Sequence, residues 1–248
     1  MVTKECDNEN LNKTGLPMKR SEINIEIRNA KQLFETICFK LPPFAYWPPA
    51  DWTGVGNEAD EIIDNMLGWD VTDYGCGDFD KYGLLLFTIR NGNHLKATKY
   101  PKSYAEKLMV IKENQIAPMH FHWKKQEDII NRGGGNLVIE LHRATDDEKL
   151  SDKPLHASID GIRKEYTAGQ EIILKPGESI FLEPFMYHKF YAQDGFGPVV
   201  IGEVSQVNDD NNDNRFLEPI GRFPSIDEDE APLHLLCTDY KKWIILRS

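Results

Sequence analysis

In this 248-residue chain, hydrophobic and polar residues follow one period near the N-terminus and another from Gly83 onward. Between residues 27 and 37 the apolar positions recur at helical spacing, and Ser21 is a suitable N-cap, so we expect a helix over residues 21–39. Residues 41–52 hold four prolines and two tryptophans, which predicts an extended loop. Residues 58–67 predict a second, short helix.

From Gly83 onward, short runs of β-forming residues are separated by glycine and proline turns. The expected strands cover residues 84–89, 106–112, 136–142, 171–174, 179–183, 187–191 and 199–204. Such spacing is typical of a sandwich or barrel. The run Gly133-Gly134-Gly135 lacks the strand–loop–helix context of a phosphate-binding loop, so we interpret it as a tight hairpin turn. We therefore expect a mainly β fold with an N-terminal helical layer.

Length and composition restrict the domain organisation and the partners. Residues 1–17 are polar and aperiodic, so we expect a disordered tail followed by a single domain over residues 18–248. The formal net charge of −11 disfavours nucleic acid and anionic membranes as partners. We find no apolar run that could span a membrane and no signal peptide. The four scattered cysteines then suggest free thiols in the cytoplasm.

The strongest chemical signal is a histidine pair followed by a carboxylate. His120 and His122 are two residues apart, so on a strand both imidazoles point to one face. Glu127 follows five residues later, and His188 comes after a second set of turn residues. Three imidazoles and one carboxylate suit Mn²⁺, Fe²⁺, Co²⁺, Ni²⁺ or Zn²⁺. We expect these four residues to bind one divalent metal ion.

Taken separately, these features are weak evidence for a metal site. A His-x-His pair is common by chance, and a lone histidine more often packs in a core. The whole arrangement favours a metal site. The remaining histidines occur near loops, at a strand end or in the acidic C-terminal region, and we expect them to be surface or packing residues: His94, His142, His156 and His234.

The spacing of these ligands resembles the two motifs of the cupins, and longer segments resemble the D-lyxose isomerase family of cupins. These segments are residues 18–24 (MKRSEIN), 41–47 (LPPFAYW), 68–75 (GWDVTDYG), 104–107 (YAEK), 120–123 (HFHW), 127–135 (EDIINRGGG), 203–210 (EVSQVNDD) and 213–218 (DNRFLE). The resemblance covers roughly residues 18–240. It implies a cupin-type β-barrel, or jelly roll. In one departure, Phe185 stands where the second motif usually has glycine, so the turn before His188 must be made differently.

The resemblance also implies an activity. Members of this family interconvert D-lyxose with D-xylulose and D-mannose with D-fructose, by proton transfer between C1 and C2 through an enediolate, and usually prefer Mn²⁺. We therefore expect a monosaccharide substrate, and the resemblance suggests a homodimer.

An isomerase of this kind needs a base and oxygen-binding groups beside the metal. We expect Lys107 to contact the substrate oxygens and Glu218 to transfer the proton, with Glu203 and Asp213 as alternative bases. The expected substrate-binding residues are Trp69, Asp70, Asp213, Arg215 and Arg222. Two other functions stay open at this point: a cupin dioxygenase with the same metal ligands, and a non-catalytic sugar-binding cupin.

Overall fold

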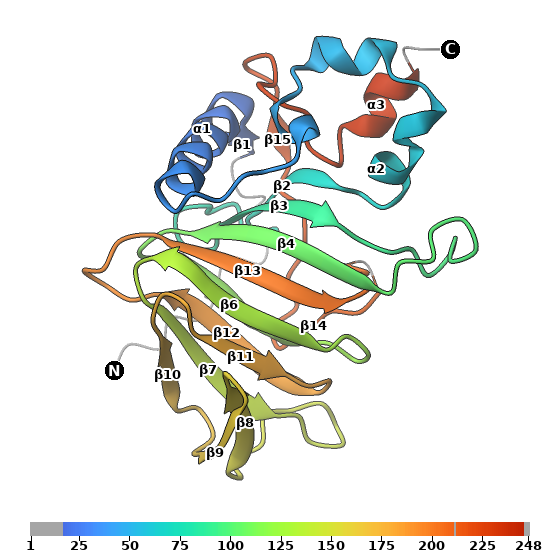
Figure 1. The fold of residues 1–248 in the computed structure, drawn as a ribbon. Coiled ribbons are helices and arrows are strands. Elements are labelled where there is room, and N and C mark those ends of the chain that lie inside the picture. Colours follow the sequence, from blue (N-terminus) through green and yellow to red (C-terminus); the bar gives the residue numbers. More distant parts are fainter. Residues whose placement is uncertain (1–16, 211, 246–248) are drawn as a thin grey trace.

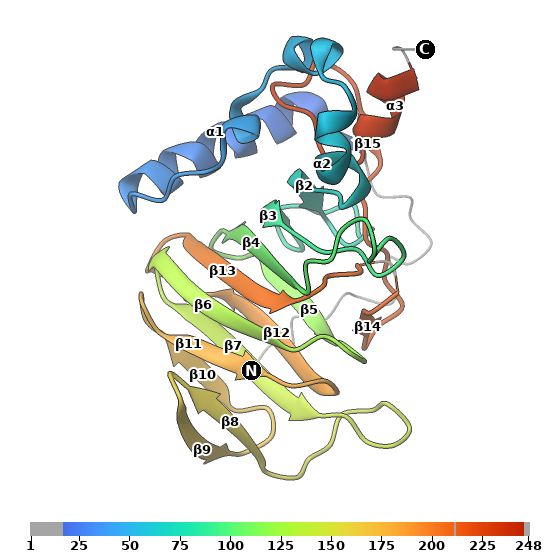
Figure 2. The same ribbon diagram turned by 45° about the vertical axis from the view of Figure 1, so that its right-hand side comes forward.

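The computed structural model describes residues 17–210 and 212–245. Of the tail predicted over residues 1–17, all but Pro17 lies outside these residues. Two antiparallel sheets pack face to face, and helices cover the outer face of the larger sheet (Figures 1 and 2). The predicted mainly β fold with an N-terminal helical layer is confirmed.

The larger sheet has eight strands. In spatial order they are β2 (Gly68–Thr72), β3 (Leu84–Arg90), β4 (Tyr104–Ile111), β13 (Val199–Gln206), β6 (Glu127–Gly134), β11 (Ser179–Leu182), β8 (Leu155–Ile159) and β9 (Ile162–Tyr166). The smaller sheet has five: β10 (Glu171–Leu174), β7 (Leu137–Arg143), β12 (Met186–Ala192), β5 (Ile116–Phe121) and β14 (Arg215–Phe216). A two-stranded parallel pair joins β1 (Met18–Lys19) to β15 (Ile226–Asp227).

The helical layer comprises α1 (Arg20–Thr36), α2 (Asp60–Asp64) and α3 (Tyr240–Ile245), with three 3₁₀ helices between α1 and α2. The 3₁₀ helices are η2 (Pro43–Tyr46), η3 (Pro49–Gly54) and η4 (Asn57–Ala59). None of the described helices is long and apolar enough to cross a membrane.

Strand alternation divides the core into two layers. On β3, Leu84 and Leu86 enter the core between the sheets, whereas Leu85 and Phe87 pack in the core beneath α1. On β4, Met109 belongs to the inner core. The same period of two therefore brings the inner positions of β4, β6 and β13 to one cavity between the sheets.

Some sequence-based boundaries differ from the structure. α1 begins at Arg20, because the Glu22 carboxylate accepts the backbone N–H of Lys19 at 3.0 Å, while the Ser21 hydroxyl donates to Asp229 instead. The expected loop over residues 41–52 contains 3₁₀ turns, and the short helix is confined to η4 and α2.

The glycine run at residues 133–135 is not the predicted hairpin turn. It connects β6 and β7, which belong to different sheets. Gly133 and Gly134 have positive φ values of 145° and 88°, and a β-carbon on Gly134 would lie 2.2 Å from the Pro198 carbonyl oxygen. Glycine is therefore required where the chain passes between the sheets.

A buried ion pair fastens α1 to the C-terminal segment. The Arg20 guanidinium is almost fully buried and binds Asp239 at 3.0 Å and Glu228 at 2.7 Å. We predict that Arg20→Ala lowers the free energy of unfolding by about 3–5 kcal/mol, because it leaves Asp239 buried without its cation. Urea denaturation measures this loss.

Lys40→Ala is the control, since it removes an exposed ion pair with Glu35. Its effect should stay within about 0.5 kcal/mol. Equal losses in the two variants would show that burial does not increase the contribution of the Arg20 ion pairs to the free energy of unfolding.

Candidate active site

Three histidines meet at one end of the cavity between the sheets. His120 lies on β5, His122 directly follows that strand, and His188 lies on β12 opposite His120 in the register. Their nearest ring nitrogens all lie within 4.8 Å of one another. The sequence-predicted histidines are thus brought together by two neighbouring strands.

Each imidazole is oriented through its Nδ1 atom. His120 Nδ1 lies 2.7 Å from the Pro118 carbonyl, His122 Nδ1 2.7 Å from the Asp213 carbonyl, and His188 Nδ1 3.0 Å from the Met186 carbonyl. A carbonyl only accepts, so each Nδ1 donates to its carbonyl and each Nε2 is the ring nitrogen left for a metal. Burial also lowers the pKa of His120 well below its ordinary value and that of His188 to about 4. Neutral imidazoles are the form that binds metals.

Glu127 adjoins this cluster at the start of β6. Its Oε1 lies 3.3 Å from Nε2 of both His122 and His188, and its Oε2 lies 2.7 Å from the Lys125 ammonium. Burial alone would raise the pKa of Glu127, but Lys125 and His122 hold it well below its usual range. The donor set, three imidazoles beside an ionised carboxylate, fits a divalent transition metal.

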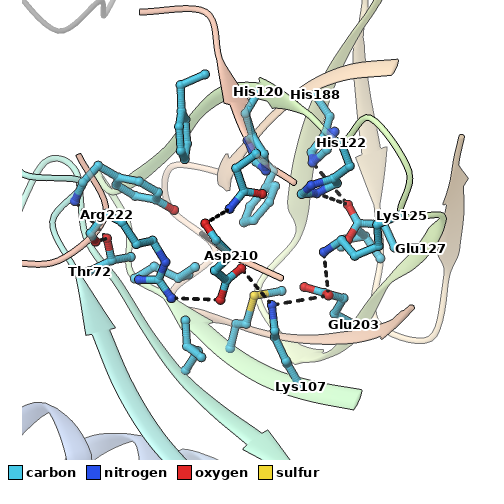
Figure 3. Close-up of a pocket in the computed structure, with 18 residues that line it drawn as sticks. Thr72, Lys107, His120, His122, Lys125, Glu127, His188, Glu203, Asp210 and Arg222 are labelled. Atoms are coloured by element: carbon cyan, nitrogen blue, oxygen red, sulfur yellow. Dashed lines mark hydrogen bonds and ion pairs between the residues drawn. The ribbon is translucent and has the colours of Figure 1, made fainter. Parts of the chain in front are cut away.

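A row of alternating charges runs from Glu127 across the cavity to the far wall (Figure 3). We call it the charge chain, and its members in order are Glu127, Lys125, Glu203, Lys107, Asp210, Arg222 and Asp70. The distances between successive charged atoms run from 2.7 Å to 3.6 Å. Four carboxylates alternate with three cations, so each cation has a carboxylate on either side.

Ion pairing decides the protonation of Glu203, Asp210 and Lys125. Burial disfavours the charged forms, yet Lys107 and Lys125 lower the pKa of Glu203, and Lys107 and Arg222 lower that of Asp210. Burial likewise opposes the charge on Lys125, but the carboxylates of Glu127 and Glu203 raise its pKa. These groups are therefore ionised at neutral pH, and removing one leaves its neighbours buried without a partner.

Two atoms of the charge chain lack a hydrogen-bond partner among the described residues. Lys125 and Ser205 both donate to Glu203 Oε1, and no described residue donates to Oε2. At the far wall, Arg222 donates through one Nη atom to Asp70 and Asp210, while its buried Nη1 finds no acceptor within residues 17–210 and 212–245. The cavity wall therefore holds one acceptor, Glu203 Oε2, and one buried donor, Arg222 Nη1, that no described residue uses.

Of the predicted substrate-binding residues, Arg222 alone lines the cavity with the metal-ligand candidates. Trp69 and Asp70 are neighbours on β2 and point to opposite faces. Trp69 is buried under α1, stacks on Phe34 and donates to the Ala45 carbonyl, so it lies outside the cavity. Asp70 lies behind Arg222 and fixes its guanidinium at 2.7 Å.

The other predicted residues also lie outside the cavity wall. Asp213 accepts the backbone N–H groups of Lys124 and Lys125, and its carbonyl orients His122, so it holds the loop rather than a substrate. Arg215 binds Glu148 on the outer side of the smaller sheet. Glu218, our first choice of base, is half-buried but is not among the residues that line the cavity.

Two residues of the charge chain were missed from the sequence. Lys125 lies two residues before Glu127, so a lysine between two metal ligands was the available signal. Asp210 lies in the polar segment 208–214 (NDDNNDN), whose composition is that of any exposed loop, and nothing in it distinguished this carboxylate.

The departure at Phe185 has a structural explanation. Phe185 adopts the left-handed conformation, with φ of 57°, and so makes the turn that glycine usually makes. Its N–H donates to the His122 carbonyl at 3.0 Å, and its ring packs on Phe121. The turn before His188 is thereby fastened to the segment that carries His122.

The comparisons with known proteins agree over nearly the whole chain. The family model described as D-lyxose isomerase matches residues 18–240. The D-lyxose/D-mannose isomerase of Escherichia coli O157:H7 is 49% identical over 91% of this chain and 100% of its own length. The chain belongs to the D-lyxose isomerase family. A relative of the same name from Serratia proteamaculans is 48% identical over 92% of this chain and 100% of its own.

Membership of the D-lyxose isomerase family identifies the chain as an isomerase. Among solved structures, a mutant L-ribose isomerase of Acinetobacter sp. DL28, in complex with L-ribose, has a TM-score of 0.58 at 14% identity and covers 87% of this chain and 100% of its own. That of Cellulomonas parahominis, with L-ribose, reaches 0.56 at 16% identity over 86% and 99%. These likenesses show the fold alone, which agrees with the predicted mainly β class.

The strain at Phe185 can be measured. A non-glycine residue in the left-handed region costs about 1–2 kcal/mol. We predict that Phe185→Gly is more stable than Phe185→Ala by about 1 kcal/mol, because both lose the ring but only glycine relieves the backbone. Urea denaturation of the two variants checks the order, and a more stable alanine variant would contradict the left-handed turn.

Proposed function

We propose that this enzyme interconverts D-lyxose with D-xylulose, and D-mannose with D-fructose, using one divalent metal ion. The observation that supports this most directly is the charge chain, which ends at the three-histidine cluster in a member of the D-lyxose isomerase family. The names of the curated relatives supply the two aldoses.

We propose His120, His122, Glu127 and His188 as the metal ligands, with Mn²⁺ as the first candidate and Co²⁺, Fe²⁺, Ni²⁺ or Zn²⁺ as alternatives. The ring nitrogens of the three histidines lie within 4.8 Å of one another, and Glu127 Oε1 lies 3.3 Å from Nε2 of His122 and His188. When bound, such an ion polarises the substrate carbonyl and stabilises negative charge on the oxygens of C1 and C2.

Glu203 is the base in this proposal, in the role that the sequence first suggested for Glu218. A base must be ionised and must reach the substrate carbons. The pKa of Glu203 is lowered, and its Oε2 accepts no hydrogen bond from a described residue. Lys125 fixes the other oxygen at 2.9 Å, which keeps the carboxylate beside the metal-ligand cluster.

The cations of the charge chain bind and orient the sugar oxygens. Lys107 donates to Asn208 at 2.6 Å and lies 3.5 Å from Glu203, so its ammonium is held at the cavity wall. Arg222 lines the opposite end of the cavity. Donors at both ends suit a linear polyol that extends away from the metal ligands.

The same charges weigh against other substrates. Each basic residue is flanked by carboxylates, so the cavity has no excess positive charge for a phosphosugar. An aromatic substrate of a dioxygenase would have to cover these ionised groups with apolar surface, at a large desolvation cost. A sugar instead replaces water with hydroxyl groups. The predicted homodimer and cytoplasmic location stay predictions.

The first test removes and restores the metal. We predict that EDTA-treated enzyme forms no D-xylulose from D-lyxose and that Mn²⁺ restores turnover, because the carbonyl is no longer polarised without the ion. A ketose assay measures the product, with D-mannose as a second substrate and D-xylose as a comparison. Turnover that survives complete removal of metal would contradict the proposal.

Two histidine variants sharpen this test. His188→Ala should lose Mn²⁺ binding and turnover, whereas His142→Ala should keep both, because His142 contacts Glu140 and the Ser151 carbonyl outside the cavity. Titration of metal-free protein with Mn²⁺ measures the binding separately from the activity.

The second test addresses the base. Glu203→Gln should lower kcat by at least about 100-fold, because the amide cannot accept the proton, while Mn²⁺ still binds. Incorporation of solvent deuterium into the ketose reports the proton transfer itself. Glu218→Gln should leave both quantities within about twofold of wild type, since its side chain lies outside the cavity wall. The opposite pattern would return the base role to Glu218.

A further inference from the structure

Glu148 occupies an unusual position on the loop between β7 and β8, which projects beyond the end of β7 (Figures 1 and 2). Hydrogen bonds within the turn fix it: the Glu148 N–H donates to the Thr145 carbonyl, and the Thr145 N–H donates to the Lys149 carbonyl. Glu148 itself is left-handed, with φ of 59°. Backbone strain of this kind persists only where surrounding contacts maintain it, so we expect the side chain and carbonyl of Glu148 to make specific contacts.

Three side chains from three separate segments converge on this one residue. Trp123 Nε1 donates to Glu148 Oε1 at 2.9 Å, and Arg215 Nε donates to Oε2 at 3.1 Å. The Tyr187 hydroxyl donates to the Glu148 carbonyl at 2.7 Å. Both carboxylate oxygens and the backbone oxygen are therefore used.

Two of these partners are next to a histidine of the proposed metal site, and the third is next to a residue that pairs with one. Trp123 follows His122, and Tyr187 precedes His188 on β12. Arg215 is on β14, where its neighbour Phe216 pairs with His120 in the register. The ring of Phe216 lies 5.2 Å from that of His120 and lines the cavity.

The contacts of Glu148 on the outer face of the smaller sheet are coupled to the histidines on its inner face through the strands themselves. Neighbouring residues on a strand point to opposite faces, so Tyr187 points outward where His188 points inward. The outer side chains also pack together: the Phe121 ring lies 4.7 Å from Tyr187 and 5.6 Å from Trp123. A movement of the loop would therefore shift the backbone on which the histidines are mounted.

We propose that Glu148 is a positioning residue that holds the two histidine-bearing segments, together with β14 beside His120, at the spacing a divalent metal requires. This proposal rests on the proposed metal site and adds to that site a residue that lies outside the cavity. Glu148 acts through Trp123, Tyr187 and Arg215, and it touches neither the metal ligands nor a substrate.

Mn²⁺ titration of metal-free protein, with free Mn²⁺ followed by electron paramagnetic resonance, tests this role. Glu148→Ala should raise the Kd for Mn²⁺ about tenfold, the lower end of the range for residues that orient metal ligands. The substitution keeps the left-handed backbone cost unchanged and removes two of the three hydrogen bonds. Glu148→Gln should recover most of the affinity, because its amide oxygen can still accept from Trp123. The visible spectrum of the Co²⁺-loaded protein should change with Glu148→Ala and not with Glu148→Gln.

Asp147→Ala is the matched control on the same loop. Its carboxylate accepts from the Thr145 hydroxyl and pairs with Lys149, both within the turn. We expect its Kd to stay within twofold of wild type. Tyr187→Phe removes the third bond without altering the loop and should raise the Kd about threefold, which keeps the test decisive if Glu148→Ala does not fold.

The outcomes separate the two proposals. If wild-type protein binds no Mn²⁺, the metal site itself fails. If wild type binds Mn²⁺ but Glu148→Ala and Tyr187→Phe bind it equally well, or Asp147→Ala weakens binding as much as Glu148→Ala, then Glu148 is only a loop residue and the positioning role is overturned.

Discussion

The structure depends on placing ionised groups between two sheets so that each has a neighbour of opposite charge. An isolated charge in such an interior costs several kcal/mol, and a pair repays this only with good geometry. The charge chain meets the condition by alternation, since Lys125 and Lys107 each lie between two carboxylates. The cavity is therefore polar and fixed before any ligand enters, which reduces the reorganisation that a reaction would require.

The fold supplies this alternation from strand registers. Lys107 on β4 pairs with Glu203 on β13 in the register, and both point inward by the same period that buries Met109 and Ile201. A shift of one residue on either strand would turn the charge toward α1 and an apolar residue into the cavity. The hydrophobic core between the sheets and beneath α1 thus fixes the chemistry of the site as well as its stability.

This explains which parts could be predicted from the sequence. The histidines and Lys107 were found because they lie on strands or follow one directly, where a period of two assigns a face. Asp210 and Glu218 lie in irregular segments, where no period tells which carboxylate faces the cavity. Trp69 and Asp70 were both predicted to bind the substrate, but they are neighbours on β2, and in a strand only one of them can face inward. Register and loop conformation are tertiary properties that local sequence does not encode.

Two strained residues flank the histidine cluster, and their strain has a common geometry. Phe185 and Glu148 both adopt left-handed backbones that glycine would adopt at lower cost. Each uses what glycine lacks: Phe185 packs its ring on Phe121, and Glu148 binds Trp123 and Arg215 through its carboxylate. Backbone strain is tolerated when surrounding contacts over-determine it. Here those contacts join β5, β12 and β14, the strands and strand ends that carry or adjoin the histidines. The strain therefore accompanies contacts that hold separate segments in one geometry. A glycine turn would lack these side-chain contacts and would leave the segments free to move.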